Sequence, residues 1–378
     1  MPEVRLSEVL REWGRIGAVG FGGPPAHVAL LRELCVTRRG WMDDREFEDA
    51  NAATQLLPGP ASTQLAIFCA GRVAGGAGAI VGGLAFVLPG LALLLVLAAV
   101  TLQDAPPDWI AGAAAGAGAA VVAVVARAGA QLAAASVLGR AGGALVRAAA
   151  YAVVGVVATV VAGPWVVLAL FGCGLAELGL RRRGAALHAW PVALAVAAHG
   201  AQELPALAWT ALKVGALSYG GGFVIVPLME GDAVREHDWM SRAEFLNAVA
   251  LGQVTPGPVT QTVAAVGYAV AGVGGALAAA AVAFVPSFLV VLLGGGRFER
   301  LRGSPGARAF LDGAGPAAVG AVLGAAGVLA QGVREPWQGV VLAGAAVALF
   351  AARLGTVPVL LAAAGAGAIA AVAGAPLP

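Results

Sequence analysis

Charged residues are scarce in this chain. They make up 12% of its 378 residues, about half the share found in a soluble domain. Apolar residues make up 60%, and the mean hydropathy is +0.86. A segment of roughly 18 apolar residues can cross the ~30 Å hydrocarbon core of a bilayer, and apolar runs near or above this length recur at 79–101, 109–126, 148–180, 270–293, 313–330, 338–352 and 354–375. The sequence therefore predicts an all-α polytopic membrane protein.

Cysteine and histidine are also rare, which limits the chemistry open to the chain. The three cysteines have no paired spacing and the four histidines are scattered, so neither disulfides nor a metal site is indicated. A net charge of +2 gives no sign of a nucleic-acid partner. The sequence has no nucleotide-binding motif, and its apolar segments have no nucleophile–base set. We therefore expect no cofactor and no enzymatic activity.

An internal duplication is the main feature that the sequence does contain. Glycines at 20–23, Trp-Met at 41–42 and Pro-Gly-Pro at 58–60 return 198 residues later, at 218–222, 239–240 and 256–258. Without a gap, 17–60 and 215–258 share 17 identical residues in 44 pairs. Chance does not produce such agreement, so this stretch is predicted to be a duplicated functional core.

Helix-breaking residues interrupt the apolar segments of both copies. Glycine favours no single backbone conformation and proline removes a backbone donor, so 16–31 and 50–70 are predicted to break at 20–25 and at 58–60. A charged loop is expected between them, at 32–49. A Gly-rich turn is then expected at 75–78, and four less interrupted spans at 79–180. If the broken segments are re-entrant, the chain has nine full spans and four hairpin pieces, and otherwise it has thirteen spans.

Arginine placement predicts opposite orientations for the two halves. In the first half Thr101–Asp108 has no basic residue, whereas Arg127–Arg147 and Arg181–Arg183 are basic. In the second half the connection equivalent to Thr101–Asp108 is the basic segment Arg297–Arg308. Basic loops stay in the cytoplasm. This pattern predicts the inverted-topology repeats of secondary transporters, with an N-terminal repeat at 1–184, a linker span at 185–203 and an inverted C-terminal repeat at 204–378.

Four strings of the first half stand out: Phe-Gly-Gly-Pro-Pro-Ala-His at 21–27, Arg-Arg-Gly-Trp at 38–41, Gln-Leu-Leu-Pro-Gly-Pro-Ala-Ser at 55–62 and Gly-Leu-Ala-Phe-Val-Leu-Pro at 83–89. They resemble the chromate ion transporter family, as do Ser-Tyr-Gly-Gly-Gly and Gln-Val-Thr-Pro-Gly-Pro at 218–222 and 253–258. The resemblance implies a two-domain member in the bacterial cytoplasmic membrane. Such a protein exports chromate, with sulfate as a related oxyanion, and gives chromate resistance. A homodimer is one of the assemblies that such a protein can form.

The two Pro-Gly-Pro strings are the predicted oxyanion site. Proline suits the first turn of a helix, where free amides and the helix dipole attract anions, and the hydroxyls that follow add neutral donors. A structural kink is the alternative, and the preceding glycines either approach the ion or pack helices closely. The expected binding residues are Arg15, Gly22, Gly23, Gln55, Pro58, Gly59, Pro60, Ser62 and Thr63 in the first half and Lys213, Gly220, Gly221, Gly222, Gln253, Pro256, Gly257, Pro258, Thr260 and Gln261 in the second.

Arg15 and Lys213 occupy equivalent positions before the glycines. A cation near an intramembrane segment is costly and commonly functional, so either can compensate a dianion, although snorkelling to the headgroups is a rival explanation for Arg15. Gln55 and Gln253 precede the strings by about one helical turn and can donate an amide to the anion or to carbonyls freed by proline. The predicted partners are the oxyanion and the lipid bilayer. The rival functions are a passive oxyanion channel and an uptake transporter for sulfate or another anion.

Overall fold

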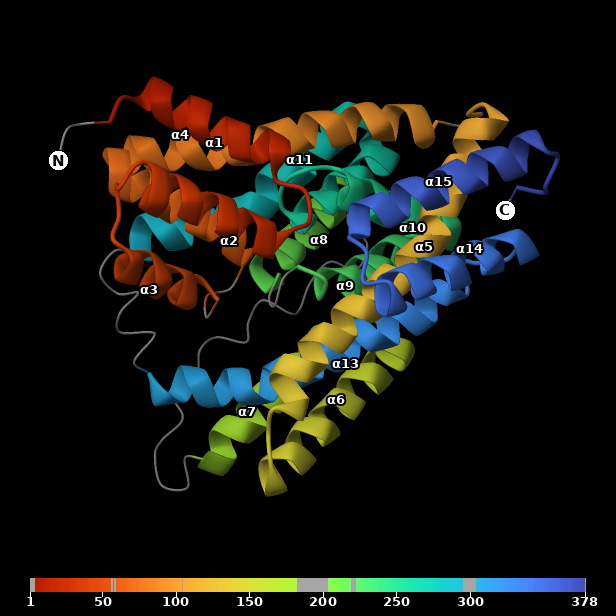
Figure 1. Ribbon diagram of the computed structural model, residues 1–378. Helices are drawn as coiled ribbons and strands as arrows, with labels where there is room; N and C mark the ends of the chain where they lie inside the picture. Colours follow the sequence, from red (N-terminus) through yellow and green to blue (C-terminus); the bar gives the residue numbers. More distant parts are fainter. Residues whose placement is uncertain are drawn as a thin grey trace.

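A computed structural model describes residues 4–55, 57, 59–103, 105–181, 203–218, 222–294 and 304–377. Across these residues the chain is helical without a strand, which confirms the predicted all-α fold. The first half contains α1 (Leu6–Val19), α2 (Pro24–Arg32), η1 (Glu33–Arg38), α3 (Asp44–Thr54), α4 (Ala61–Thr101), α5 (Asp108–Ala133), η2 (Ala134–Leu138), α6 (Gly142–Ala162), η3 (Gly163–Trp165) and α7 (Val166–Arg181). The second half contains α8 (Glu203–Leu217), α9 (Ile225–Glu230), η5 (Gly231–Glu236), α10 (Arg242–Val254), η6 (Val259–Gln261), α11 (Thr262–Gly294), α13 (Pro305–Ala330), α14 (Pro336–Ala346), η7 (Val347–Ala351) and α15 (Thr356–Val372) (Figure 1).

The breaks in the helices fall where glycine and proline predict them. In the first copy α1 ends at Val19 and α2 begins at Pro24, and α3 ends at Thr54 before α4 begins at Ala61. In the second copy α10 ends at Val254, and helical structure resumes at η6. The duplicated sequence therefore encodes two copies of one local structure.

The predicted charged loop at 32–49 is wrong. Glu33–Arg38 continue α2 as a π-helical turn, and α3 begins at Asp44. Asp43 caps α3, because its Oδ1 accepts a hydrogen bond from the Glu46 amide at 2.7 Å, and this capping satisfies one of the free donors at the helix start. The connection predicted at Arg127–Arg147 is also shorter than expected, since α5 continues through Arg127.

Both α4 and α11 are hairpins whose two arms fold back on each other. The turns lie at Ala74–Gly75 and Ala271–Gly272, where both glycines have positive φ, 67° and 59°. A Cβ added to Gly71 would lie 3.1 Å from the Ala79 Cβ, across the turn of α4. The first arm of α4, 61–73, rises only ~20 Å at 1.5 Å per residue, which is too short to cross a bilayer. This geometry favours the re-entrant alternative.

Five helices in the described part of the chain are long and apolar enough to cross a membrane: Ala61–Thr101, Asp108–Leu138, Gly142–Ala162, Val259–Gly294 and Pro305–Ala330. Pro336–Ala351 and Thr356–Val372 are shorter apolar helices. Helices α5 and α13 are largely buried, whereas α6 exposes a row of valines, Val146, Val153, Val157, Val160 and Val161. In a membrane such a row faces lipid. The predicted linker span at 185–203 lies outside the described residues, apart from Glu203.

The two halves exchange helices. Helix α5 of the first half packs against α14 and α15 of the second, and α13 of the second half packs against α6 and α7 of the first (Figure 1). Small residues make these contacts close, as is common between membrane helices. A Cβ added to Gly116 would lie 3.0 Å from the Gly367 Cα, and one added to Gly320 would lie 2.9 Å from the Ala152 Cα. Each half therefore completes the other.

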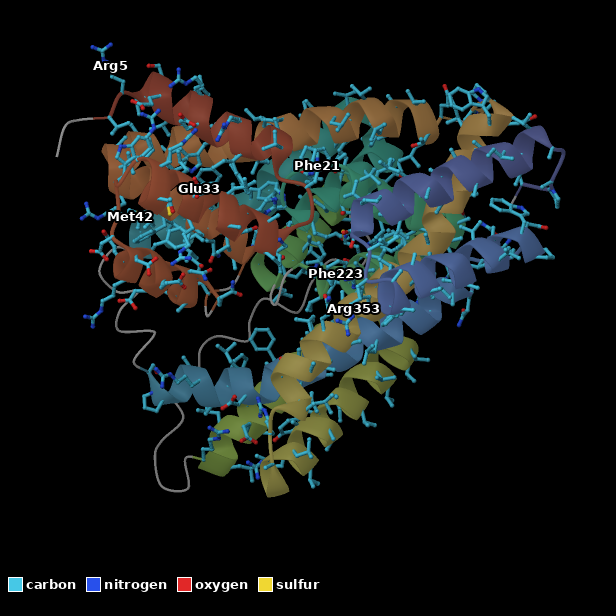
Figure 2. All side chains as sticks on the ribbon, viewed as in Figure 1. Arg5, Phe21, Glu33, Met42, Phe223 and Arg353 are labelled. Carbon is cyan, nitrogen blue, oxygen red and sulfur yellow. The ribbon has the colours of Figure 1, made fainter. Side chains whose placement is uncertain are left out.

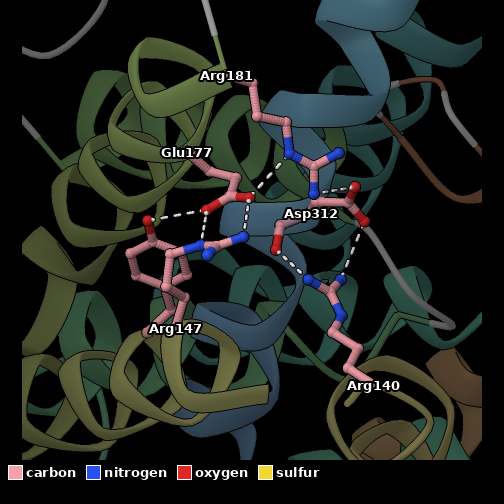
Figure 3. A network of polar contacts seen from close by, with 6 residues as sticks. Arg140, Arg147, Glu177, Arg181 and Asp312 are labelled. Atoms are coloured by element: carbon pink, nitrogen blue, oxygen red, sulfur yellow. Dashed lines mark hydrogen bonds and ion pairs between the residues drawn. The ribbon is translucent and has the colours of Figure 1, made fainter. Parts of the chain in front are cut away.

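A polar network around the buried Glu177 side chain joins α13 to α6 and α7 (Figure 3). Glu177 is almost fully buried and accepts hydrogen bonds from Arg147 at 2.9 Å and Arg181 at 2.8 Å. Asp312 of α13 pairs with Arg181 at 2.9 Å and with Arg140 at 3.0 Å. Because Arg140 follows the end of η2, this network brings the early turns of α13 to the end of α5.

Helices α5 and α13 consequently run antiparallel. Besides the Arg140–Asp312 contact, a Cβ added to Gly129 would lie 2.9 Å from the Leu323 Cγ, so residue numbers fall along α13 as they rise along α5. The equivalent helices of the two halves therefore point in opposite directions, as inverted repeats require.

Candidate oxyanion site at the paired helix breaks

A small pocket lies where the breaks of the two halves meet. It is lined by Pro24, Pro60, Ala61, Ser62, Gly222, Pro258, Val259 and Thr260. These eight residues are four equivalent pairs, because each residue of the first half has its counterpart 198 positions later. In Figure 2, Phe21 marks the turn before α2 and Phe223 the turn before α9, which border this region. The pocket therefore lies on the approximate two-fold axis that relates the halves.

Reciprocal contacts across this axis hold the breaks in place. A Cβ added to Gly59 would lie 3.1 Å from Ser287 Oγ, and one added to Gly90 would lie 2.9 Å from Gln261 Nε2. Beyond the turns at Gly75 and Gly272 the offset between the halves is 197 residues, so Gly90 and Ser287 are equivalent, and both lie near the middle of the second arms of α4 and α11. The Pro-Gly-Pro string of each half thus packs against the middle of a long helix of the other half.

The Pro-Gly-Pro strings have a backbone that requires glycine. Gly59 has φ 117° and Gly257 has φ 99°, values that L-residues with a Cβ rarely adopt. Pro60 and Pro258 then precede the helix starts, and no side chain caps either one. The first amides of each helix have no acceptor within it, so these positions combine free donors with the positive end of a helix dipole.

Two hydroxyl groups at equivalent positions of the pocket have different partners. Ser62 Oγ lies 3.1 Å from His27 Nδ1, and both side chains are buried. Thr260 Oγ1 lies 3.1 Å from Ser218 Oγ and is buried as well. The hydroxyls are therefore held in fixed positions by neighbours that the duplication did not preserve.

The Gly20 carbonyl connects the two halves beside the pocket. It accepts a hydrogen bond from His27 Nε2 at 2.9 Å and another from the Gly257 amide at 3.1 Å. The imidazole of His27 consequently bridges Ser62 of α4 and the turn after α1. The same turn also contacts the Pro-Gly-Pro string of the second half.

The remaining predicted site residues lie at varying depths around the pocket. Thr63 and Gln261 are fully buried, and Gln261 Nε2 donates to the Pro256 carbonyl at 2.8 Å. The Thr63 hydroxyl has no hydrogen-bond partner among the described residues. Gly22 and Gly23 both have positive φ just before α2. Gln55 and Gln253 lie at the ends of α3 and α10 and do not line the pocket, and Pro58, Gly220 and Gly221 lie outside the described residues.

The two predicted cations have acidic partners and do not line the pocket. Lys213 Nζ lies 2.6 Å from an oxygen of the buried carboxylate of Asp232, which also accepts from Thr210 at 2.9 Å. Arg15 is 58% exposed and lies 4.0 Å from Glu12. Burial raises the pKa of Glu12, but hydrogen bonds from the arginines of η1 and the residue after it outweigh burial and hold that pKa below its ordinary value. Whether either cation serves the anion stays a prediction.

Sequence reasoning missed three residues that line the pocket, Pro24, Ala61 and Val259, and two that bond to its hydroxyls, His27 and Ser218. Pro24 and His27 belong to the string at 21–27, but the histidine carried no signal because its partners are 7 and 35 residues away. Ser218 stands at the position equivalent to Gly20, so it could have been found by examining the equivalent positions at which the two halves carry different residues.

Together these features define a class: a multi-pass helical membrane protein whose two similar halves enclose a pocket at paired helix breaks. The chromate transporter family matches residues 7–178 and 205–370, and the chain belongs to this family. It is 32% identical over 341 residues to the chromate transport protein of Cupriavidus metallidurans, which covers 87% of this chain and 84% of the relative. It is 29% identical over 339 residues to the chromate transport protein of Pseudomonas aeruginosa, covering 85% of this chain and 80% of the relative. No solved structure matches the chain.

Proposed function

We propose that this protein is a secondary active transporter that exports chromate across the cytoplasmic membrane and thereby gives chromate resistance. Family membership and the names of its relatives support chromate as the substrate. The sequence has no nucleotide-binding motif, so the energy would come from an ion gradient or from exchange.

The observation that carries the proposal is the pocket lined by four equivalent pairs of residues. Inverted-repeat transporters bind their substrates where broken helices of both repeats meet near the membrane midplane. The helix starts at Ala61 and Val259 offer free amides, and Ser62 and Thr260 add hydroxyls. Several moderate neutral donors suit a tetrahedral dianion, because they bind it without trapping it.

The membrane arrangement is part of the same proposal. Residues 1–184 and 204–378 form the two inverted repeats, and 185–203 crosses the membrane between them. The antiparallel course of α5 and α13 supports this arrangement. In the proposed arrangement Thr101–Asp108 lies in the periplasm and the basic connection 297–308 lies in the cytoplasm, on the side of Arg140 and Arg181.

Chromate flux into inside-out vesicles tests the function. A secondary active exporter produces saturable uptake that proceeds against a chromate gradient when a proton or counter-anion gradient is supplied. A passive oxyanion channel only dissipates an existing gradient, and an uptake transporter works in right-side-out vesicles. Competition by sulfate and molybdate in the same assay decides the selectivity. Uptake that never exceeds equilibrium would overturn the active mechanism.

A further inference from the structure

His27 is a buried titratable group in direct contact with the pocket wall. Its side chain is fully buried, its Nδ1 lies 3.1 Å from Ser62 Oγ, and its ring meets Phe86 edge-on with centroids 4.9 Å apart. Ser62 lines the pocket. His27 is not among the residues expected to bind the anion.

The hydrogen bonds of His27 fix which ring nitrogen carries a proton. A carbonyl oxygen can only accept, so Nε2, 2.9 Å from the Gly20 carbonyl, is the donor. In the neutral ring Nδ1 is then a bare acceptor, and the Ser62 hydroxyl must donate its hydrogen to it. In this state Ser62 Oγ presents lone pairs to the pocket, which repel an oxyanion.

A proton on Nδ1 reverses this hydrogen bond. Nδ1–H then donates to Ser62 Oγ, and the Ser62 hydroxyl hydrogen becomes free to donate to an anion in the pocket. The imidazolium also places a positive charge one residue behind the wall, and its burial is favourable only when a counter-charge is present. A bound dianion supplies that counter-charge.

We propose that His27 takes up one proton from water when an oxyanion enters the pocket, with Ser62 as the link between them. This inference rests on the proposed function of the pocket. The proton binds the Nδ1 lone pair and leaves it when the anion departs, so no covalent bond to the substrate forms. His27 is a positioning residue, since it acts on the anion through Ser62.

Other ionisable groups near α2 do not explain such a response. Among the described residues, the ionisable groups of α2 and of the elements packed against it are paired elsewhere or exposed: Glu8 with Arg39, Arg11 and Arg15 with Glu12, Glu12 with Arg38 and Arg39, Arg32 with Asp44, Arg72 with Glu46, Cys35 with Cys69, and exposed Glu33. The ring of His27 contacts the Gly20 carbonyl, Ser62 and Phe86. No charged side chain in the described part of the chain is placed against it by a hydrogen bond or ion pair.

The second half offers a built-in control. Ile225 stands at the position equivalent to His27, and the Thr260 hydroxyl is held by Ser218 instead. A serine hydroxyl does not titrate near neutral pH, so the Thr260 hydroxyl of the second half cannot respond to pH. Proton-linked binding is therefore confined to the Ser62 side of the pocket.

Chromate binding to the purified full-length protein tests this asymmetry. Dissociation constants are measured between about pH 5.5 and 8, a span that brackets the pKa of an unperturbed histidine, for the parent, His27→Gln, Ser62→Ala and Thr260→Val. The titration of chromate itself is common to all four and cancels in the ratio of parent to variant. One linked proton changes that ratio by up to about ten-fold for each pH unit.

We expect the parent to gain affinity relative to His27→Gln and to Ser62→Ala as the pH falls. Thr260→Val should bind more weakly at every pH but keep the slope of the parent. A constant ratio of parent to Ser62→Ala across the range overturns the proposal, even if His27→Gln fails to fold, because Ser62→Ala leaves the imidazole in place. Chromate binding to none of the four proteins at any pH overturns the proposed function itself.

Discussion

Arg242 of α10 pairs with Glu230 of α9, with Nε 3.4 Å from Oε1. The equivalent positions 198 residues earlier are Asp44 and Arg32, which also pair, with the acid and the base exchanged. The contact between the second and third helices of each half therefore persisted while its charges were reversed. The environments differ, because the Glu230 side chain is 3% exposed and also pairs with Arg235 at 3.0 Å, whereas Arg32 is about half exposed.

This difference predicts unequal costs for losing the two pairs. Glu230→Ala leaves Arg235 and Arg242 without their buried counter-charge and should destabilise the protein by about 3–5 kcal/mol. Arg32→Ala removes an exposed pair that solvent screens, so its melting temperature should match the parent. Thermal unfolding of both variants in detergent measures the effect. Equal shifts would contradict the assigned environments.

Lys213 and Asp232 form the second buried pair whose loss can be predicted. Lys213→Ala leaves the Asp232 carboxylate buried and uncompensated, at a cost of about 3–5 kcal/mol. Adding Asp232→Asn removes the orphaned charge and should restore most of the stability. If Lys213 also compensates the anion, the stable double variant still binds chromate about ten- to a hundred-fold more weakly, which corresponds to a lost charge-assisted contact. Parent-like affinity in the double variant would make the lysine purely structural.

The exchange of helices between halves predicts a sharp contrast on α13. A Cβ at Gly320 would meet the Ala152 backbone of α6, while nothing lies within 4 Å of one added at Gly327. Gly320→Ala should therefore cost about 1–3 kcal/mol through overpacking, and Gly327→Ala should cost nothing. Detergent melting curves compare them directly. If both variants melt like the parent, α13 does not pack against α6 as described.

Cysteine labelling tests the inverted arrangement in the membrane. The native cysteines are buried, so a new cysteine on each connection reports its side. Gln103→Cys should react with an impermeant thiol reagent added outside the cell, and Gly303→Cys should react only after the membrane is opened. The reason is the opposite arginine content of the two equivalent connections. Labelling of both from one side would refute inverted repeats.

The sequence predicted where the helices break, but not how the helices of the two halves pack together. Repeated Pro-Gly-Pro and glycine clusters identified the helix breaks, because positive φ at Gly59 and Gly257 is a local backbone requirement. The packing of α5 against the second half and of α13 against the first could not be predicted, because alanine- and glycine-rich helices have no distinct face that identifies the helix they pack against. The Lys213–Asp232 pair was missed for a related reason: it depends on how α8 packs against the start of η5, not on the spacing of the residues.

The two pocket hydroxyls allow a final test of whether the Pro-Gly-Pro strings bind the anion or only bend the helices. Ser62→Ala and Thr260→Val nearly preserve volume, so a purely structural kink should tolerate both with unchanged expression and melting temperature. If the hydroxyls donate to the anion, each single variant should lose about 0.5–1.5 kcal/mol of chromate binding. Because both address one ion, the double variant should depart from the sum of the singles by more than about 0.5 kcal/mol. Chromate binding by the parent and the three variants at one pH completes the cycle. A double variant that binds like the parent would make the strings hinges and place the anion elsewhere in the molecule.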